Sequence, residues 1–529
     1  MKKLVSAEQA ARLVADDDIV TVSSSSGLGC PDKVLEALGA RFASEGHPRN
    51  LTMLHPIAAG DMYGIRGIDH LAHPGMIAKI LAGSYPSGPS SLPMPGIWRL
   101  ITDNQVAAWN LPSGVMFDMH RDAAAKRPGV LTKVGLDTFV DPARQGGAMN
   151  ARAAADPFVQ KMSFVGEEWL FYPAVVPRVA ILRATSADER GNLSFEHEGA
   201  LLGAFDQALA ARNNKGIVIA QVKRMVRAGS IRPHDVHVPG ALVDFVVVDP
   251  DQKQTTQTHY DPAISGEIQR ADDSFELTGW GLEKVIARRA AMELAKGQTA
   301  VLGFGISANV PRILIEEGLH GDVTWAIEQG AVGGVPLLGF AFGCSANADA
   351  IVPSSSQFTY FQGGGFDVAL LSFLQVDASG SVNVSRLGAK PYLTAGCGGF
   401  VDITTHGKKL VFAGFFTAGA KLEASDGKLC IRQEGKSRKF VDEIEHVTFS
   451  ARMGLARAQQ VTYVTERCVI ELSAGGLMVT EIAPGIDLRR DVLDQCEFSL
   501  KVAQGLKTMD AALFRDRPLN LSIRERVHA

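Results

Sequence analysis

Short apolar runs rich in Val, Ile and Leu alternate along this chain with stretches of helical periodicity. The apolar runs cover residues 216–222, 242–248, 299–303, 368–374 and 410–413, and the helical stretches include residues 31–42, 282–296 and 311–317. Strands that are apolar throughout are typical of parallel sheets with helices on both faces. The pattern therefore predicts an α/β fold built on open, mostly parallel sheets.

Three segments of the first half of the chain recur in the same order in the second half. The matching pairs are VAILRATSADERGNLS at 179–194 with VALLSFLQVDASGSVN at 368–383, KGIVIAQV at 215–222 with KKLVFAGF at 408–415, and DIVTVSSSSGLGCP at 18–31 with QTAVLGFGISANVP at 298–311. A shared order of elements predicts two homologous domains in one chain.

The spacing of these repeats also predicts where the domains differ and where they meet. The most N-terminal pair is offset by 280 residues and the other two by 189 and 193, which indicates an insertion of about 90 residues in the first half. The Pro- and Gly-rich stretch around 70–160 is the candidate insertion. Residues 249–279 are polar and aperiodic, as in a linker. We therefore expect an N-terminal domain over 1–275 and a C-terminal domain over 276–529.

Composition narrows the class of protein without naming a function. The 529 residues are 46% apolar and 21% charged, with a formal net charge of −4 and no block of like charges. These values are typical of a globular protein and argue against a nucleic-acid-binding surface. The six cysteines form no CxxC pair or zinc-spaced cluster, which predicts free thiols and no metal site. The chain shows neither a secretory leader nor a long apolar run, so we expect a cytoplasmic protein.

Glycine-rich junctions between a predicted strand and a predicted helix are the first candidate sites for chemistry. In the second half, Gly303 and Gly305 end an apolar run just before a helix start. Backbone N–H groups at such a junction can bind a phosphate, a carboxylate or a developing oxyanion. The alternative is that the glycines only let strand and helix pack closely. Gly27 and Gly29 occupy the matching junction of the first half, after a run of serines that we interpret as a tightly packed turn.

One acidic residue stands out at the end of an apolar run. In VTWAIEQGAVGGVP the run that begins at Val323 leads directly to Glu328, and Gly330, Gly333 and Gly334 follow. Glycines around an acid at the mouth of a strand would leave room for a substrate. A solvated or ion-paired glutamate is the simpler alternative.

Taken together, these segments resemble the family I coenzyme A transferases, in particular the single-chain propionate or acetate CoA-transferases in which two subunit-like halves are fused. The resemblance covers most of the chain and rests on seven ordered motifs: NLPSGV at 110–115, KRPGVLTKVGLDTFVDPARQGGAMN at 126–150, EEWLFYP at 167–173, EQGAVGGVP at 328–336, FQGGGFD at 361–367, AGCGGFVDI at 395–403 and EIAPGIDLRRDVL at 481–493.

The resemblance implies two open-sheet α/β domains with the active site at their interface, and a ping-pong exchange of CoA. The catalytic glutamate of the family matches Glu328, which would carry CoA as a γ-glutamyl thioester. The family pattern also implies a set of oxyanion and CoA-binding positions: Gly303, Gly305, Ile306, Gly398 and Gly399. It implies acyl-CoA and a carboxylic acid as substrates, no resident cofactor or metal, and a homo-oligomer, either a dimer or a tetramer.

One position departs from the family pattern. Related transferases carry Gln in the stretch NLPQG, where this chain has Ser113. We expect Gly27, Gly29 and Ser113 of the first half to face Glu328 and to contact the substrate. The shorter side chain suggests either a bulkier acyl group or entry of water and hence hydrolysis.

The expected function is acyl-CoA:carboxylate CoA transfer on a short- or medium-chain acid. Two alternatives remain, namely an acyl-CoA hydrolase on the same scaffold and a non-catalytic sensor of CoA esters. The sequence does not identify the acid or the residues that bind the CoA phosphates.

Overall fold

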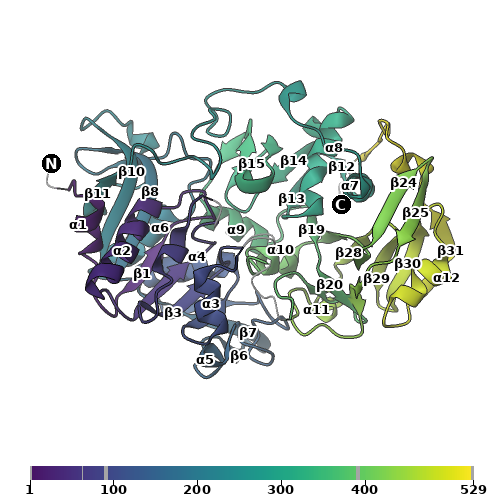
Figure 1. Cartoon of the computed structure of the whole chain (residues 1–529), viewed down its shortest axis with the longest axis horizontal. Helices are drawn as coiled ribbons and strands as arrows, with labels where there is room; N and C mark the ends of the chain where they lie inside the picture. The colour runs from purple at the N-terminus through teal and green to yellow at the C-terminus, as the bar shows by residue number, and fades with distance from the viewer. Residues whose placement is uncertain (1–2, 62–63, 88–92, 389–393, 526–529) are drawn as a thin grey trace.

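The computed structural model describes residues 3–61, 64–87, 93–388 and 394–525, and these form two large open sheets with helices on both faces. Figure 1 shows the first sheet on the left and the second extending from the centre to the right. The predicted α/β fold of two fused open-sheet domains is confirmed.

The first sheet has the strand order β11-β10-β8-β1-β2-β3-β4, and every pair along this path is parallel. Its strands are β1 (Ile19–Val22), β2 (Leu51–His55), β3 (Ile77–Ala82), β4 (Ala107–Asn110), β8 (Val179–Asp188), β10 (Ile217–Val226) and β11 (Phe245–Val248), with β9 (Leu193–Ser194) antiparallel to β8. Its helices are α1 (Ala7–Ala11), α2 (Asp32–Glu45), α3 (Gly96–Thr102), α4 (Ser113–Ala124) and α6 (Ala204–Arg212).

Successive residues of these strands are buried on opposite faces. In β3, Ile80 packs with residues of α2 and α3, whereas its neighbour Leu81 packs with residues of α4. Burial on both faces is the reason why the strands read as unbroken apolar runs rather than as alternating ones.

The second sheet has the order β18-β15-β14-β13-β19-β22-β28-β29-β30-β31, and its five central strands, β14 to β28, are parallel. Its strands are β13 (Gln298–Leu302), β14 (Val323–Ala326), β15 (Ala331–Val332), β18 (Ala350–Ile351), β19 (Val368–Ser372), β22 (Lys409–Ala413), β28 (Gln460–Val464), β29 (Cys468–Ser473), β30 (Gly476–Ile482) and β31 (Lys501–Thr508). Its helices are α7 (Leu282–Ala291), α8 (Val310–Glu316), α9 (Ser354–Gln362), α10 (Phe400–His406), α11 (Ala451–Ala456) and α12 (Leu488–Asp491).

The repeated segments form equivalent parts of the two sheets. They supply β10, β8 and β1 of the first sheet and β22, β19 and β13 of the second, and in both sheets the three strands are neighbours in that order. One predicted helix is too long, because α7 ends at Ala291 and not at residue 296. The chain instead forms the short strand β12 (Ala295–Lys296), which pairs with β32 (Arg524–Glu525).

Residues 70–160 of the first half form part of the first sheet and its helices, and they also begin a separate small sheet. They hold β3, β4 and α4 and begin a three-stranded antiparallel sheet of β5 (Gly129–Thr132), β6 (Gln160–Phe164) and β7 (Glu167–Pro173), with α5 (Ala151–Ala154) between them. The domain boundary near residue 275 stays a prediction.

The second half also contains several small sheets. They pair β16 (Val335–Pro336) with β17 (Ser345–Ala346), β20 (Gln375–Asp377) with β21 (Val382–Asn383) and β27 (Phe440–Val441), β23 (Thr417–Ala418) with β26 (Ser437–Arg438), and β24 (Lys421–Ser425) with β25 (Lys428–Gln433).

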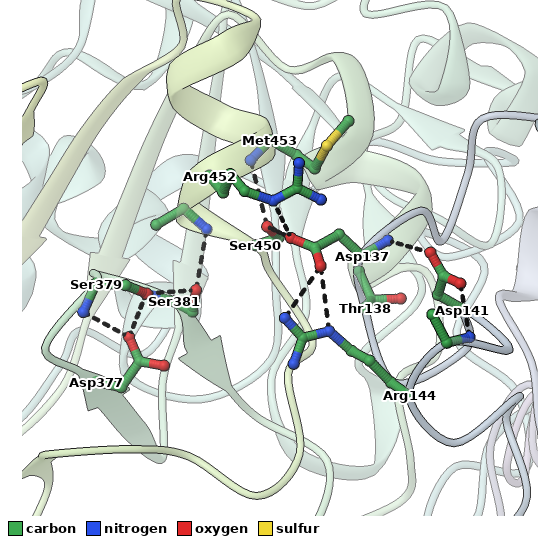
Figure 2. Close-up of polar contacts among 12 residues, drawn as sticks. Asp137, Thr138, Asp141, Arg144, Asp377, Ser379, Ser381, Ser450, Arg452 and Met453 are labelled. Atoms are coloured by element: carbon green, nitrogen blue, oxygen red, sulfur yellow. Dashed lines mark hydrogen bonds and ion pairs between the residues drawn. The ribbon is translucent and has the colours of Figure 1, made fainter. Parts of the chain in front are cut away.

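A loop of the first half, residues 133–147, is bound to the second half through Asp137 (Figure 2). One carboxylate oxygen of Asp137 accepts hydrogen bonds from Ser450 Oγ at 2.6 Å and from Arg452 Nε at 3.0 Å. The other oxygen accepts a hydrogen bond from Arg144 Nη2 at 3.0 Å. We call these contacts the Asp137 clasp; it ties the two halves together.

Three features of the chain bear on the earlier expectations. All six cysteines are free thiols, as predicted. Within the described residues, no helix has the length and hydropathy needed to cross a membrane. No group of three or more His, Cys, Asp or Glu side chains in that part of the chain is arranged to hold a metal ion.

Candidate active site

Glu328 lies just beyond the carboxyl end of β14, close to the interface between the halves. A glycine that follows it, Gly330, has a φ of 118°, and a Cβ there would lie 1.9 Å from the carbonyl oxygen of Val352. A Cβ at Gly333 would likewise lie 1.9 Å from a carboxylate oxygen of Asp349. These glycines therefore allow the chain to turn sharply against neighbouring segments, and the expectation that they also leave room for a substrate stays a prediction.

The residue that leaves room for Glu328 is Gly399, which comes from another segment. A Cβ at Gly399 would lie 2.5 Å from Glu328 Oε2 and 2.7 Å from the ring of Phe358. The Gly399 N–H donates a hydrogen bond to the same oxygen at 3.2 Å. The side chain of Gln329 donates to the other carboxylate oxygen, Oε1, at 3.1 Å.

Burial dominates the electrostatics of Glu328. It raises the pKa of this carboxyl from 4.5 to about 7, against the opposing effect of the two hydrogen bonds from Gly399 and Gln329. No Lys, Arg or His among the described residues forms an ion pair with Glu328, although the side chain is only partly exposed. A carboxylate without a counter-charge and with little water around it is more reactive as a nucleophile than a solvated one.

The first half reaches Glu328 through the residue next to it. Gln329 is 4% exposed, and its amide donates both to Glu328 and to Ser25 Oγ of the first half, at 3.1 Å each. Ser25 belongs to the serine run that precedes Gly27 and Gly29. The sequence-based prediction of a first-half turn facing the glutamate thus corresponds to a contact mediated by Gln329.

Gly27 and Gly29 themselves are explained by packing inside the first half. A Cβ at Gly27 would lie 2.2 Å from Thr256 Oγ1, and one at Gly29, where φ is 61°, would lie 2.7 Å from Leu202 Cδ1. A contact of either glycine with the substrate stays a prediction.

The segment 395–399, which we call the glycine loop, crosses from the second half onto the first. The Gly398 N–H donates to the carbonyl oxygen of Gly83 at 2.9 Å, and the Ser113 N–H donates to the carbonyl oxygen of Gly398 at 3.0 Å. The Cys397 N–H donates to Asn110 Oδ1 at 2.9 Å. Because the Gly398 N–H is already engaged, Gly399 supplies the amide of this loop that faces Glu328.

The junction after β13 lies one strand away from Glu328, at the same edge of the sheet. The Gly303 N–H donates to the carbonyl oxygen of Leu370 at 2.8 Å, so it extends the sheet. Gly305 has a φ of 102°, and a Cβ there would lie 2.6 Å from Ser372 Oγ. Ile306 begins the 3-10 helix η4 (Ile306–Asn309). Backbone N–H groups at Gly305 and Ile306 remain candidate donors to a substrate.

Ser113 is the first residue of α4 and is fully buried. Its hydroxyl has no hydrogen-bond partner among the described residues, and a Cβ at Gly83 would lie 2.3 Å from that oxygen. Ser113 therefore meets the glycine loop through its backbone, and its side chain packs against Gly83.

Two residues of the site, Asn110 and Gln329, were not selected from the sequence. Asn110 donates to the carbonyl oxygens of Ala82 and Gly83, at 3.1 and 2.7 Å, while accepting from Cys397. Both residues lie inside motifs that carry the family resemblance, and this position was the only feature of the sequence that could have indicated a role in the site.

A cavity of about 530 Å³ opens at the same edge of the second sheet. Its lining includes Arg312, the acidic residues Glu276 and Glu283, and Trp280, Asn309, Leu338 and Phe415. Arg312 is 6% exposed, its Nε has no partner among the described residues, and burial lowers its pKa to about 10. A buried guanidinium group that forms no ion pair is suited to bind an anion.

Comparisons with known proteins agree on the kind of protein, and the relatives match nearly the whole chain. A sequence model of the family described as "Coenzyme A transferase" matches residues 4–249. The chain is 42% identical to the caffeate CoA-transferase of Acetobacterium woodii over 523 aligned residues, 98% of each chain. It is 38% identical to the acetate CoA-transferase YdiF of Escherichia coli K12, over 99% of this chain and 97% of the relative.

One solved structure extends the similarity to three dimensions. It is the acyl-CoA transferase YdiF of Escherichia coli O157:H7 in a thioester complex with CoA, and it superposes on this chain with a TM-score of 0.90 at 36% sequence identity. The match covers 99% of this chain and 98% of that chain.

Proposed function

This chain belongs to the coenzyme A transferase family and is a CoA-transferase, and from that premise we propose that it moves CoA between a short- or medium-chain acyl-CoA and a free carboxylic acid through a thioester on Glu328. The observation that carries the proposal is the environment of Glu328. Its carboxyl is partly buried beside the interface between the halves, forms no ion pair and accepts one backbone hydrogen bond, from Gly399.

In the first half-reaction the ionised Glu328 carboxylate attacks the carbonyl carbon of the acyl-CoA. The tetrahedral intermediate collapses with loss of the CoA thiolate and leaves an acyl-glutamyl anhydride. The thiolate then attacks the carbonyl carbon of Glu328, the free acid leaves as its carboxylate, and CoA remains on the enzyme as a thioester. A second carboxylate reverses these steps, so the cycle consumes no water and no high-energy phosphate.

Each tetrahedral intermediate places negative charge on a former carbonyl oxygen. The Gly399 N–H already points at Glu328 Oε2, so it would stabilise the oxyanion that forms at the glutamyl carbon. Removing one such donor typically costs about 3 kcal/mol of transition-state stabilisation. Gly305 and Ile306 are proposed donors for the oxyanion of the substrate. The amides of Gly303 and Gly398 bond within the protein, so those glycines would contribute close backbone approach.

We assign the cavity beside Arg312 to the phosphate-bearing end of CoA. Asn309 and Phe415, which line it, follow β13 and β22, so the cavity opens at the edge of the sheet where Glu328 lies. The positive charge of Arg312 is complementary to a CoA phosphate, whereas Glu276 and Glu283, which also line the cavity, oppose it. CoA would serve as a substrate with no resident cofactor. The expected homo-oligomer stays a prediction.

The acid that accepts CoA is proposed on two grounds. Relatives are named for caffeate and for acetate, which differ greatly in size. In this chain Ser113 replaces the larger Gln of related transferases, and its hydroxyl is packed against Gly83. We favour transfer to an acid bulkier than acetate, and hydrolysis is the outcome against which transfer is tested.

Intact-protein mass spectrometry tests the covalent step. After incubation with an acyl-CoA, the wild type should gain the mass of CoA less one water, and added carboxylic acid should remove it. Glu328→Ala should gain nothing, whereas Glu423→Ala, an exposed glutamate on the β24–β25 hairpin, should behave as the wild type. An adduct on Glu328→Ala would contradict the proposal. Release of free CoA at the same rate without an acceptor acid would assign a hydrolase.

A further inference from the structure

Helix α4 begins at the interface between the halves, and its first two amides are bound by the other half. No side chain of its own segment caps it, because Pro112 occupies the N-cap position. The Ser113 N–H donates to the carbonyl oxygen of Gly398 at 3.0 Å, and the Gly114 N–H donates to Asp402 Oδ2 at 3.0 Å. The second half thus supplies the acceptors that a helix N-terminus needs.

Asp402 lies in α10 and is fully buried. Its other oxygen, Oδ1, accepts a hydrogen bond from Gln362 Nε2 at 3.0 Å, and no cation among the described residues forms an ion pair with it. A Cβ at Gly114 would lie 2.5 Å from Asp402 Oδ1 and 2.7 Å from Gln362 Nε2. The carboxylate is therefore held by two donors, and only glycine lets α4 approach it so closely.

Helix α10, which carries Asp402, is also connected to Glu328. Helix α10 starts at Phe400, immediately after Gly399, whose N–H donates to Glu328 Oε2. Gly399 and Asp402 are separated by less than one helical turn, so their relative positions are fixed by backbone hydrogen bonding. In Figure 1 helices α4, α9 and α10 lie together in the middle of the molecule, where the two halves meet.

We propose that Asp402 is a positioning residue for the transfer reaction. It fixes the first turn of α4, with Ser113, relative to Gly399 and Glu328, so that a substrate held by the first half meets the nucleophile of the second. This inference rests on the proposed role of Glu328. It assigns to Asp402 no contact with the substrate.

Two substitutions test the proposal. Asp402→Ala removes both acceptors and should lower kcat by about 100-fold, the loss expected when a reacting group is displaced by about 1 Å. Asp402→Asn keeps the shape but has one acceptor oxygen, so either Gly114 N–H or the Gln362 amide faces an NH₂ group; we expect a loss of about 10-fold. In both variants KM for acyl-CoA should change by less than about 3-fold, because the substrate contacts are intact.

The Asp137 clasp supplies a matched control (Figure 2). Asp137 also joins the halves through a carboxylate, by way of Ser450 and Arg452, but it touches neither the glycine loop nor α4. Asp137→Asn should lower Tm and leave kcat near the wild-type value. If general loosening of the interface explained the loss in the Asp402 variants, Asp137→Asn would lose kcat as well.

A pH profile provides a readout that a merely structural role would not change. The titratable groups that face Asp402 are Glu328, Asp118, Tyr172 and Cys397. Burial raises the pKa of Asp402 to about 7, so Asp402 and Glu328 ionise over the same pH range. Asp402→Asn removes the negative charge that Asp402 gains in that range, so the acidic limb of kcat/KM should move to lower pH. An unmoved limb would argue that the two carboxyls are not coupled and would count against the proposal.

The outcomes separate this inference from the proposed function. If the wild type forms no CoA adduct, or Glu328→Ala turns over normally, the proposed function fails. If the wild type forms the adduct while both Asp402 variants retain wild-type kcat, only the positioning role is overturned. The positioning role is also overturned if the lower activity of each variant is fully explained by a smaller fraction of enzyme molecules that form the CoA adduct. In that case kcat per active site is unchanged.

Discussion

Lowering the pH from 8 to 6 should slow the attack of Glu328 on acyl-CoA about tenfold. In the proposed mechanism the nucleophile is the ionised carboxylate, and burial raises the pKa of Glu328 to about 7. With that pKa about 91% of the enzyme is ionised at pH 8 and about 9% at pH 6. A glutamate that kept its ordinary pKa would be about 97% ionised even at pH 6, and its rate would hardly change.

The assay is the rate of CoA-adduct formation in a single turnover at low acyl-CoA concentration, followed by acid quench and intact-protein mass. This measurement reports the ionisation of the free enzyme and avoids product release. The logarithm of the rate should rise with a slope approaching one below pH 7 and level off above it. A rate that stays flat between pH 6 and 8, or that falls as the pH rises, would refute the argument that a buried, unpaired Glu328 is the nucleophile.

Three further predictions follow from the geometry of the site. Because the pKa of Glu328 is raised, its contribution to stability is present below pH 4.5 and is lost as the pH rises through about 7. The Tm of Glu328→Gln should therefore exceed that of the wild type by more at pH 8 than at pH 5. Thermal melts that show an equal difference at both pH values would contradict this. Gly399→Ala places a Cβ 2.5 Å from Glu328 Oε2 and 2.7 Å from Phe358, so kcat should fall by about 100-fold or more, whereas Gly505→Ala, with nothing within 4 Å, should match the wild type in the same steady-state assay. Arg312→Gln should raise KM for acyl-CoA about tenfold with little change in kcat, and an unchanged KM would remove Arg312 from the CoA site.

The sequence predicted the architecture because the order of strands and helices depends on the local pattern of apolar and polar residues. The apolar runs became the central strands of both sheets, since strands covered on both faces have no polar side. The repeated segments became β10, β8 and β1 in one sheet and β22, β19 and β13 in the other, because homologous segments fold alike. The length of α7 was overestimated, because its last predicted turn is taken by β12, whose partner β32 lies more than 220 residues further along the chain.

The candidate site was only partly predictable, because hydrogen-bond partners are not encoded locally. Glu328 was identified by its place after an apolar strand and by its motif. Nothing in AGCGGFVDI indicates that the Gly398 N–H is engaged by Gly83 while the Gly399 N–H faces Glu328. The glycines that follow Glu328 in sequence serve the backbone turn, and the space around the carboxyl comes from Gly399, 71 residues away.

The sequence by itself determined the class of fold and its duplication, and it singled out Glu328 as the candidate nucleophile, since each of these is carried by residues that are neighbours along the chain. The tertiary structure decided the environment of that carboxyl. Burial without a counter-charge, the single backbone amide of Gly399 and the bond from Gly114 to Asp402 across 288 residues exist only once the two halves are packed together. A pKa depends on which groups surround a carboxyl in space, and the linear order of residues does not specify those groups.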